Sequence, residues 1–244
     1  MELLVVGAGA MGRWFGAVVA EAADDPVTLQ FADSDPAAAR EAADALGGEV
    51  AEARSAEVVC VAVPMPDAPA VITEYAPGAA AVVDVTGSME GPVAAMREHA
   101  PAAERLSLHP LFAPENAPGS VPFVADAEGP LTDTIREALA AAGNDLVATT
   151  PEEHDEAMET VQARTHAAVL AFGLAAEPVP EGFETPISAA LREQVDQVTD
   201  GDPRVYADIQ AAFDGAEDIA AAAERIADAD PEAFEQLYRE AGDE

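Results

Sequence analysis

The sequence contains no lysine, a single cysteine and few aromatic residues. All 11 basic side chains are arginines and stand against 47 acidic ones, which gives a formal net charge of −36 at pH 7. Binding to nucleic acid or to an anionic membrane depends on clustered basic side chains, so the composition argues against both kinds of partner. The lone Cys60 lies inside an apolar run, which predicts a buried small side chain and excludes a disulfide within the chain.

The acidic residues are spread along the whole chain and do not form a tail. We interpret the charge as an adaptation to multimolar salt, typical of an extreme halophile, where the Debye length falls to about 3 Å and charge repulsion is screened. No apolar run approaches the ~18–20 residues of a membrane span, and no segment resembles a signal peptide, so we predict a cytoplasmic protein. No group of His, Cys, Asp and Glu has metal-ligand spacing, and we predict no metal.

The opening segment shows the order strand, glycine-rich turn, helix, strand and acid that is typical of dinucleotide binding. Gly7 allows the tight turn, Gly9 lets the backbone approach a pyrophosphate, and Gly12 lets the helix pack closely on the strand. Asp33 stands where a carboxylate would bind the adenosine ribose 2′-hydroxyl and repel a 2′-phosphate, so we predict NAD in preference to NADP. The predicted cofactor-binding residues are Gly7, Gly9, Met11, Gly12, Asp33 and Pro64.

Strand and helix patterns alternate up to about residue 150, which predicts an α/β fold with a Rossmann-type doubly wound sheet. Beyond the second strand, apolar runs predict strands at 49–51, 57–63, 80–85, 106–109, 122–125 and 146–149. Helical patterns lie at 36–46, 68–75, 91–98 and 131–142, and a loop is expected at 110–122. In such a sheet, ligands bind beyond the carboxyl ends of the strands. Three predicted strand ends therefore point to the site, at residues 64–65, 87–88 and 109–110.

From Pro151 onward the sequence reads as helices with no convincing strand. The predicted helices are 151–175, 186–199, 203–212, 216–229 and 231–240. We therefore place a boundary near residue 150, between an NAD-binding domain at 1–150 and an all-α domain at 151–244.

Each of the four histidines can be weighed separately. His109 follows a predicted strand, where a neutral imidazole can accept a proton next to a nicotinamide. His99 ends a polar helix and is expected at the surface or at the helix cap. His154 and His166 share one predicted helix, where about 120° and about 18 Å would separate them, so they cannot act at one point. For His154 a capping, interdomain or catalytic role stays open, and for His166 a core or a ligand-binding role.

Several segments together resemble prephenate dehydrogenases of the short archaeal type that lack a fused mutase domain. The matching segments are Gly7–Gly12, Asp84-Val85-Thr86-Gly87-Ser88, His109-Pro110-Leu111-Phe112, His154-Asp155 with Thr165-His166-Ala167, and the stretch from Asp202 to Gln210. The resemblance spans about residues 1–213. It implies a helical second domain that forms a homodimer interface, with the active site between the domains.

The resemblance also implies an activity, the NAD-dependent oxidative decarboxylation of prephenate to 4-hydroxyphenylpyruvate in tyrosine biosynthesis. It makes His109 the hydrogen-bond acceptor or general base for the ring hydroxyl of the substrate. It makes Ser88 the hydroxyl that orients the substrate and the nicotinamide, and His166 a substrate contact on the helical domain.

Two positions depart from the family pattern. Family members often carry a lysine where this chain has Glu90, and many carry an arginine where it has Gln197. Prephenate is a dianion, and a guanidinium is the natural bidentate partner of a carboxylate. Arg192 or Arg164 is therefore the candidate substrate-binding cation.

Three alternatives stay open. Arogenate differs from prephenate only in its side chain, so an arogenate dehydrogenase fits the same motifs. A reductase of the same domain order could act on a β-hydroxyacid, an imine or a deazaflavin-linked substrate, although several such enzymes rely on a lysine that this chain lacks. A non-catalytic NAD-binding regulator would keep the glycine turn and Asp33, but it would have no turnover to lose when His109 is replaced.

Overall fold

The computed structural model describes residues 1–23, 25–54 and 56–242. It divides into two compact units, Met1–Asp155 and Glu156–Glu244. The division falls inside helix α6 (Pro151–Met158), a few residues after the position expected from the sequence. Which function each part carries stays a prediction.

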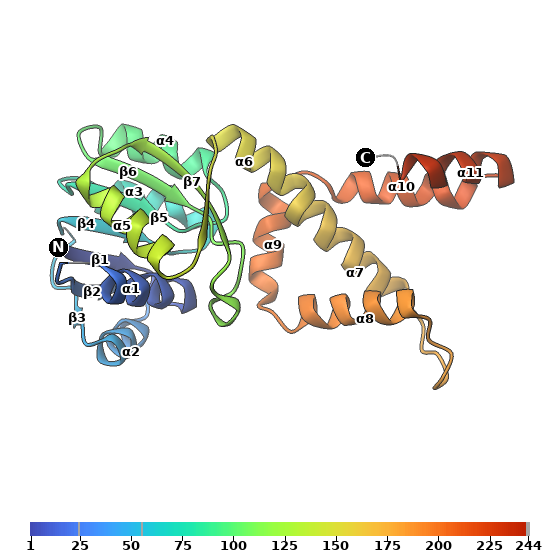
Figure 1. Cartoon of the computed structure of the whole chain (residues 1–244), viewed down its shortest axis with the longest axis horizontal. Coiled ribbons are helices and arrows are strands. Elements are labelled where there is room, and N and C mark those ends of the chain that lie inside the picture. The colour runs from blue at the N-terminus through green and yellow to red at the C-terminus, as the bar shows by residue number, and fades with distance from the viewer. Residues whose placement is uncertain (24, 55, 243–244) are drawn as a thin grey trace. The chain divides into compact units, whose positions relative to one another are not determined.

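The first unit is built around an eight-stranded sheet in the order β3-β2-β1-β4-β5-β6-β7-β8 (Figure 1). Its strands are β1 (Glu2–Val6), β2 (Thr28–Ala32), β3 (Glu49–Val50), β4 (Val58–Val61), β5 (Ala81–Asp84), β6 (Glu104–Leu108), β7 (Ser120–Ala127) and β8 (Asp145–Ala148). The strand order reverses between β1 and β4, at the switch point where doubly wound sheets bind their ligands. The Rossmann-type sheet predicted from the sequence is confirmed.

The last two strands depart from the parallel pattern. β7 pairs antiparallel with β6, and β8 pairs parallel with β7, so both run opposite to β1–β6. A parallel connection needs a crossover of about a dozen residues or more, usually a helix. The segment between β6 and β7 contains the short 3₁₀ turn Pro114–Asn116 and no crossover helix in this described stretch. The chain therefore turns back directly, and the predicted loop at 110–122 ends earlier because β7 begins at Ser120.

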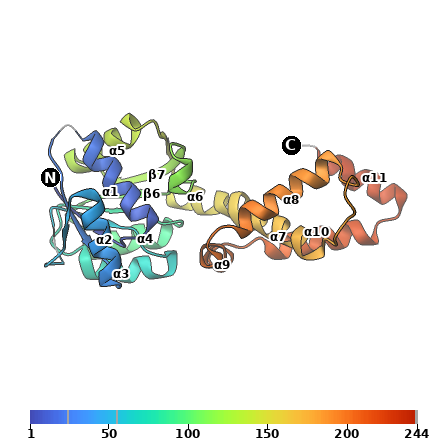
Figure 2. The same ribbon diagram turned by 90° about the horizontal axis from the view of Figure 1, so that it is seen from below.

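Side chains alternate along each buried strand, so the sheet has an apolar core on each of its two faces. Different helices cover these two faces (Figure 2). Leu3 and Val5 of β1 pack into a core with α1, α2 and α5. Leu4 and Val6 point the other way and pack with α3 and α4. The helices of this unit are α1 (Ala10–Ala22), α2 (Pro36–Leu46), α3 (Ala68–Tyr75), α4 (Glu90–His99) and α5 (Pro130–Ala141).

The second unit consists of helices and connecting loops, with no strand among its described residues. Its elements are the π-helical segment η3 (Glu159–Arg164), α7 (Thr165–Ala175), α8 (Pro186–Thr199), α9 (Pro203–Ala212), α10 (Ala216–Asp228) and α11 (Pro231–Glu240). The predicted bounds of α8, α9 and α11 are confirmed at both ends. Each begins at a proline, and the side chain of Thr185, Asp202 or Asp230 caps it.

The helix predicted over residues 151–175 is interrupted. η3 separates α6 from α7, and a π-helical turn is wider than an α-helical one. The rotation expected between His154 and His166 on a regular α-helix therefore does not apply to this segment.

Candidate active site

The glycine turn between β1 and α1 is shaped by close backbone packing at two of its glycines. Gly7 has φ +102°, and a Cβ there would overlap the carbonyl oxygen of Ala62 at the end of β4. A Cβ at Gly12 would overlap the carbonyl oxygen of Gly7. Gly9 is different, because a Cβ there would meet no described atom within 4 Å. The fold requires glycine at two positions, whereas the third leaves open space of the kind a pyrophosphate would need.

Asp33 lies against this turn, as the sequence predicts. Its Oδ2 accepts a hydrogen bond from the Ala8 amide at 2.7 Å, and its Oδ1 accepts one from the Asp35 amide at 2.8 Å. Met11 is half-buried in the first turn of α1, and Pro64 directly precedes the 3₁₀ turn Met65–Asp67 that follows β4. The predicted cofactor-binding residues therefore gather at the carboxyl ends of β1, β2 and β4, and their binding role stays a prediction.

The loop after His109 packs on the helix that follows the glycine turn. The ring of Phe112 meets the ring of Trp14 on α1 edge-to-face, with centroids 5.3 Å apart. Gly119 lets the loop close, since a Cβ there would overlap the Phe112 ring. Sequence reasoning did not find this contact, because Trp14 and Phe112 are distant in the chain.

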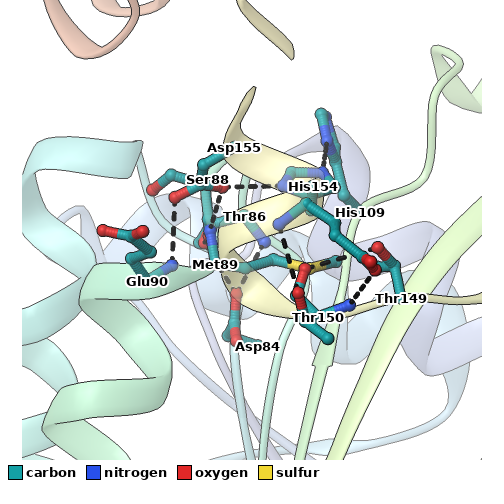
Figure 3. A network of polar contacts seen from close by, with 11 residues as sticks. Asp84, Thr86, Ser88, Met89, Glu90, His109, Thr149, Thr150, His154 and Asp155 are labelled. Atoms are coloured by element: carbon teal, nitrogen blue, oxygen red, sulfur yellow. Dashed lines mark hydrogen bonds and ion pairs between the residues drawn. The ribbon is translucent and has the colours of Figure 1, made fainter. Parts of the chain in front are cut away.

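His109 is buried at the carboxyl end of β6 and begins a chain of hydrogen bonds (Figure 3). Its Nδ1 lies 2.9 Å from Nε2 of His154, and Nδ1 of His154 lies 2.7 Å from Oδ1 of Asp155. The Asp155 carboxylate also accepts the backbone N–H groups of Met89 at 2.9 Å and Glu90 at 3.1 Å, where α4 begins. The sequence left capping, interdomain and catalytic roles open for His154, and the structure places its side chain in hydrogen-bond contact with His109.

The electrostatics of this chain keep His109 neutral. Burial, followed by the neighbouring His154, lowers the pKa of His109 to about 3, against an opposing effect of Asp155. Asp155 behaves in the opposite way. Its partial burial favours the protonated form, but hydrogen bonds from His154, Glu90 and Met89 outweigh that and hold the pKa of Asp155 below its usual value. A neutral imidazole backed by a carboxylate is an arrangement suited to accepting a proton.

Ser88 is half-buried in the turn after β5, and β5 pairs with β6, the strand that His109 follows. The turn is held by Asp84, whose Oδ1 accepts from the Thr86 amide at 3.1 Å and the Thr86 hydroxyl at 2.6 Å. The same hydroxyl is 3.2 Å from the carbonyl oxygen of Ser88. Because Met89 donates to Asp155, the turn is fixed on both sides of Ser88. In the sequence, Asp84 is part of the segment Asp84–Ser88 that carries the family resemblance, and its own signal is an acid at the end of an apolar strand.

Asp84 is fully buried, and this should make stability pH-dependent. Burial raises the pKa of Asp84 to about 7, against the hydrogen bonds that Thr86 donates to it. A carboxyl whose folded pKa exceeds its unfolded value of about 3.9 stabilises the fold at low pH and loses that contribution as pH rises through 7. We expect Asp84→Asn to gain about 2–3 kcal/mol relative to wild type between pH 5 and pH 8.5. Urea unfolding at both pH values in the same salt measures it, and a constant difference would contradict the assignment.

The predicted substrate contact His166 lies on α7 in the second unit. Its ring meets Tyr206 of α9 edge-to-face at a centroid distance of 4.8 Å. Burial lowers the pKa of His166, and its Nδ1 has no hydrogen-bond partner among the described residues. The side chain is therefore neither a fully satisfied core histidine nor a surface one.

The two candidate arginines differ in how closely acidic side chains contact their guanidinium groups. The Arg164 guanidinium contacts Asp218 at 2.7 Å and Glu159 at 3.2 Å. Arg192 on α8 has a looser contact, with Nε 3.6 Å from Oε1 of Glu184. Arg192 is thus the arginine better placed to exchange its partner for a ligand carboxylate.

In the part of the chain that the structure describes, no three His, Cys, Asp or Glu side chains are grouped so that they could hold a metal ion. Within the same residues, no helix combines the length and apolar character that crossing a membrane requires.

Comparison with known proteins gives two similar sequences. A 4-amino-4-deoxyprephenate dehydrogenase from Streptomyces pristinaespiralis is 32% identical over 237 residues, covering 88% of this chain and 78% of that protein. A "Probable arogenate/prephenate dehydrogenase" from Methanocaldococcus jannaschii is 27% identical over 179 residues, covering 65% of this chain and 39% of that protein. No protein-family model matches the chain.

Solved structures show the same fold. Prephenate dehydrogenase from Aquifex aeolicus, in complex with hydroxyphenyl propionate and NAD+, matches with a TM-score of 0.73 and 16% identity, covering 100% of this chain and 92% of that one. Arogenate dehydrogenase from Synechocystis matches with a TM-score of 0.60 and 15% identity, covering 99% and 98% of the two chains.

Proposed function

Because the chain belongs to the prephenate dehydrogenase family of NAD-dependent oxidoreductases, we propose that it converts prephenate to 4-hydroxyphenylpyruvate. The observation that carries the proposal is the buried, neutral His109, whose Nδ1 is committed to His154 at the carboxyl edge of the sheet. A base held in this way fits a reaction in which a ring hydroxyl must lose its proton as hydride departs.

The residues present fit the NAD cofactor. The amides of the glycine turn would receive the pyrophosphate, with open space at Gly9, and Asp33 would receive the adenosine ribose. When bound, NAD supplies the acceptor for the hydride. His109 would take the proton of the C4 hydroxyl at Nε2 as the carbon–oxygen double bond forms. Loss of the ring carboxylate as carbon dioxide then makes the ring aromatic, and His109 returns the proton to the phenolate oxygen.

Several residues besides His109 are candidates for substrate recognition. We propose Ser88 as the hydroxyl that orients the C4 hydroxyl, and His166 and Arg192 as substrate-binding residues of the helical unit. Arg164 is a further candidate, although Asp218 and Glu159 already occupy its guanidinium. An arginine that replaces a water-exposed acid partner with a substrate carboxylate keeps a charge-assisted pair, so the exchange costs little.

Two other substrates of the same class have support. The Streptomyces relative is named for 4-amino-4-deoxyprephenate, which carries an amine at C4 where prephenate has the hydroxyl. Arogenate fits the shortage of basic side chains, since the chain has 11 arginines and no lysine and arogenate carries less net negative charge than prephenate. Both would use His109 in the same role.

The test is NADH formation at 340 nm in multimolar KCl, with each of the three substrates and with NAD or NADP. Turnover with prephenate supports the proposal, and a strong preference for another of the three moves the assignment within the family. If none is turned over while NAD still binds, the function is not a dehydrogenation of these compounds and a regulatory NAD-binding protein is favoured.

Three further properties are proposed with this function: adaptation to high salt, a cytoplasmic location and a homodimer. The charge of −36 supports the first, because a chain so acidic needs screening by concentrated ions. Apolar side chains exposed in the helical unit support the third; they include Leu174 on α7 and Ile187 on α8, 90% and 75% exposed. Sedimentation equilibrium in multimolar KCl distinguishes a dimer from a monomer.

Cofactor choice should depend on Asp33. We expect Asp33→Asn to lower NAD affinity about 10-fold through loss of a charged hydrogen bond to ribose, and to raise the kcat/KM ratio of NADP to NAD. Asp35→Asn is the matched control, since the Asp35 side chain caps α2 at the Ala37 amide. An unchanged cofactor ratio in Asp33→Asn would show that this carboxylate does not face the ribose.

A further inference from the structure

We propose that His154 and Asp155 form a proton relay behind His109. When His109 accepts a proton at Nε2, its Nδ1 proton moves to Nε2 of His154, so that the positive charge comes to rest beside Asp155. The inference rests on the proposed role of His109 as the group that accepts the substrate proton.

The hydrogen-bond partners fix the tautomer of each ring. An ionised carboxylate can only accept, so Nδ1 of His154, 2.7 Å from Asp155 Oδ1, must carry a proton. In a neutral His154 the other nitrogen, Nε2, is then an acceptor. Because Nε2 of His154 lies 2.9 Å from Nδ1 of His109, that nitrogen of His109 must be the donor. Nε2 of His109 is left as the nitrogen with the lone pair.

Charge stability favours the movement of the second proton. His109 is buried, and burial together with His154 lowers the pKa of His109 to about 3, so an imidazolium there is unfavourable. An imidazolium on His154 would instead form a charged pair with Asp155 at 2.7 Å. Protons balance, since His109 gains one at Nε2 and passes one on from Nδ1. The reverse shift restores both rings when the proton returns to product.

Asp155 is held in its charged form by the start of α4. It accepts two backbone amides there, from Met89 and Glu90, at the positive end of the helix dipole. The charge of Asp155 also helps to raise the pKa of the buried Asp84. The Met89 amide directly follows Ser88, so one carboxylate positions both the base and the turn that carries the candidate hydroxyl. His154 and Asp155 are positioning residues that act through His109.

The tautomers can be measured without any turnover. We expect ¹⁵N NMR of histidine-labelled protein at pH 7 to show His109 and His154 neutral, each with its proton on Nδ1. The four histidines make assignment practical, through the signals lost in His109→Asn and His154→Gln. A proton on Nε2 of His109, or a charged His154 in the resting protein, would overturn the relay.

The second arm separates proton transfer from orientation. In His154→Gln the side-chain amide can accept from His109 Nδ1 and donate to Asp155, but it cannot carry a proton onward. We expect kcat to fall about 10- to 100-fold in both His154→Gln and His154→Ala, with substrate KM and NADH affinity within about 2-fold of wild type. Recovery of wild-type kcat by glutamine would overturn the relay and leave orientation alone.

His99→Gln is the control, because His99 ends α4 and contacts none of these groups in the described network. Thermal unfolding of each variant in the same salt identifies a fold defect. If the wild-type protein turns over none of the substrates, the proposed function fails, and the NMR result still decides whether the resting tautomers that the relay requires are present.

Discussion

Replacing His109 with asparagine is expected to lower kcat by about 10²- to 10⁴-fold, the usual contribution of a positioned acid–base group. The amide of asparagine can still donate to His154, so the buried hydrogen bond need not be left empty. It has no lone-pair nitrogen with which to take the substrate proton. The loss should therefore appear in kcat, with little change in NAD affinity.

The measurement pairs turnover at 340 nm with a cofactor titration. Trp14 is the single tryptophan of the chain and lies on α1 directly after the glycine turn, so its fluorescence is a natural probe of NAD binding. His99→Asn serves as the matched control. A kcat for His109→Asn within about 5-fold of wild type would show that His109 is not the base.

The second large effect is expected from Gly9→Ala. The methyl group would meet no described atom within 4 Å, so the unfolding free energy should stay within about 1 kcal/mol of wild type. The same methyl group would occupy the space through which a pyrophosphate approaches the turn amides. We expect NAD affinity to fall at least about 10-fold.

Gly12→Ala provides the contrast. There the added methyl group overlaps the carbonyl oxygen of Gly7, so the fold itself should lose stability. Fluorescence titration and urea unfolding of both variants distinguish the two cases. If Gly9→Ala binds NAD as tightly as wild type, the cofactor does not lie against this turn, and the nucleotide-binding assignment of the glycines is wrong.

Much of the fold follows from short-range sequence signals. α2 was predicted at 36–46 and has those bounds, because Asp35 caps its first turn and Gly47 takes φ +67° after its last. The buried strands were predicted from apolar runs, which record burial on both faces of a parallel sheet. In each case, the residues that decide the element lie within a few positions of it.

Part of the candidate site also follows from local sequence signals, and part of it does not. The glycine turn, Asp33 and His109 each follow the carboxyl end of a strand. Parallel strands bring their carboxyl ends to the same edge of the sheet, so these residues can be placed near one another from the sequence. The contact of His109 with His154 and Asp155 joins elements that are far apart in sequence, so no local pattern announces it. The same applies to the hold of Asp155 on the start of α4.

The sequence by itself determined the nucleotide-binding order, the helical second part and the histidine at the end of β6, because capping, glycine geometry and side-chain alternation act locally. Tertiary structure alone decided that β7 runs antiparallel, that residues 159–164 are π-helical, and that His154 and Asp155 stand behind His109. Each of these depends on which distant segments pack together, and burial then sets the pKa values of His109 and Asp84.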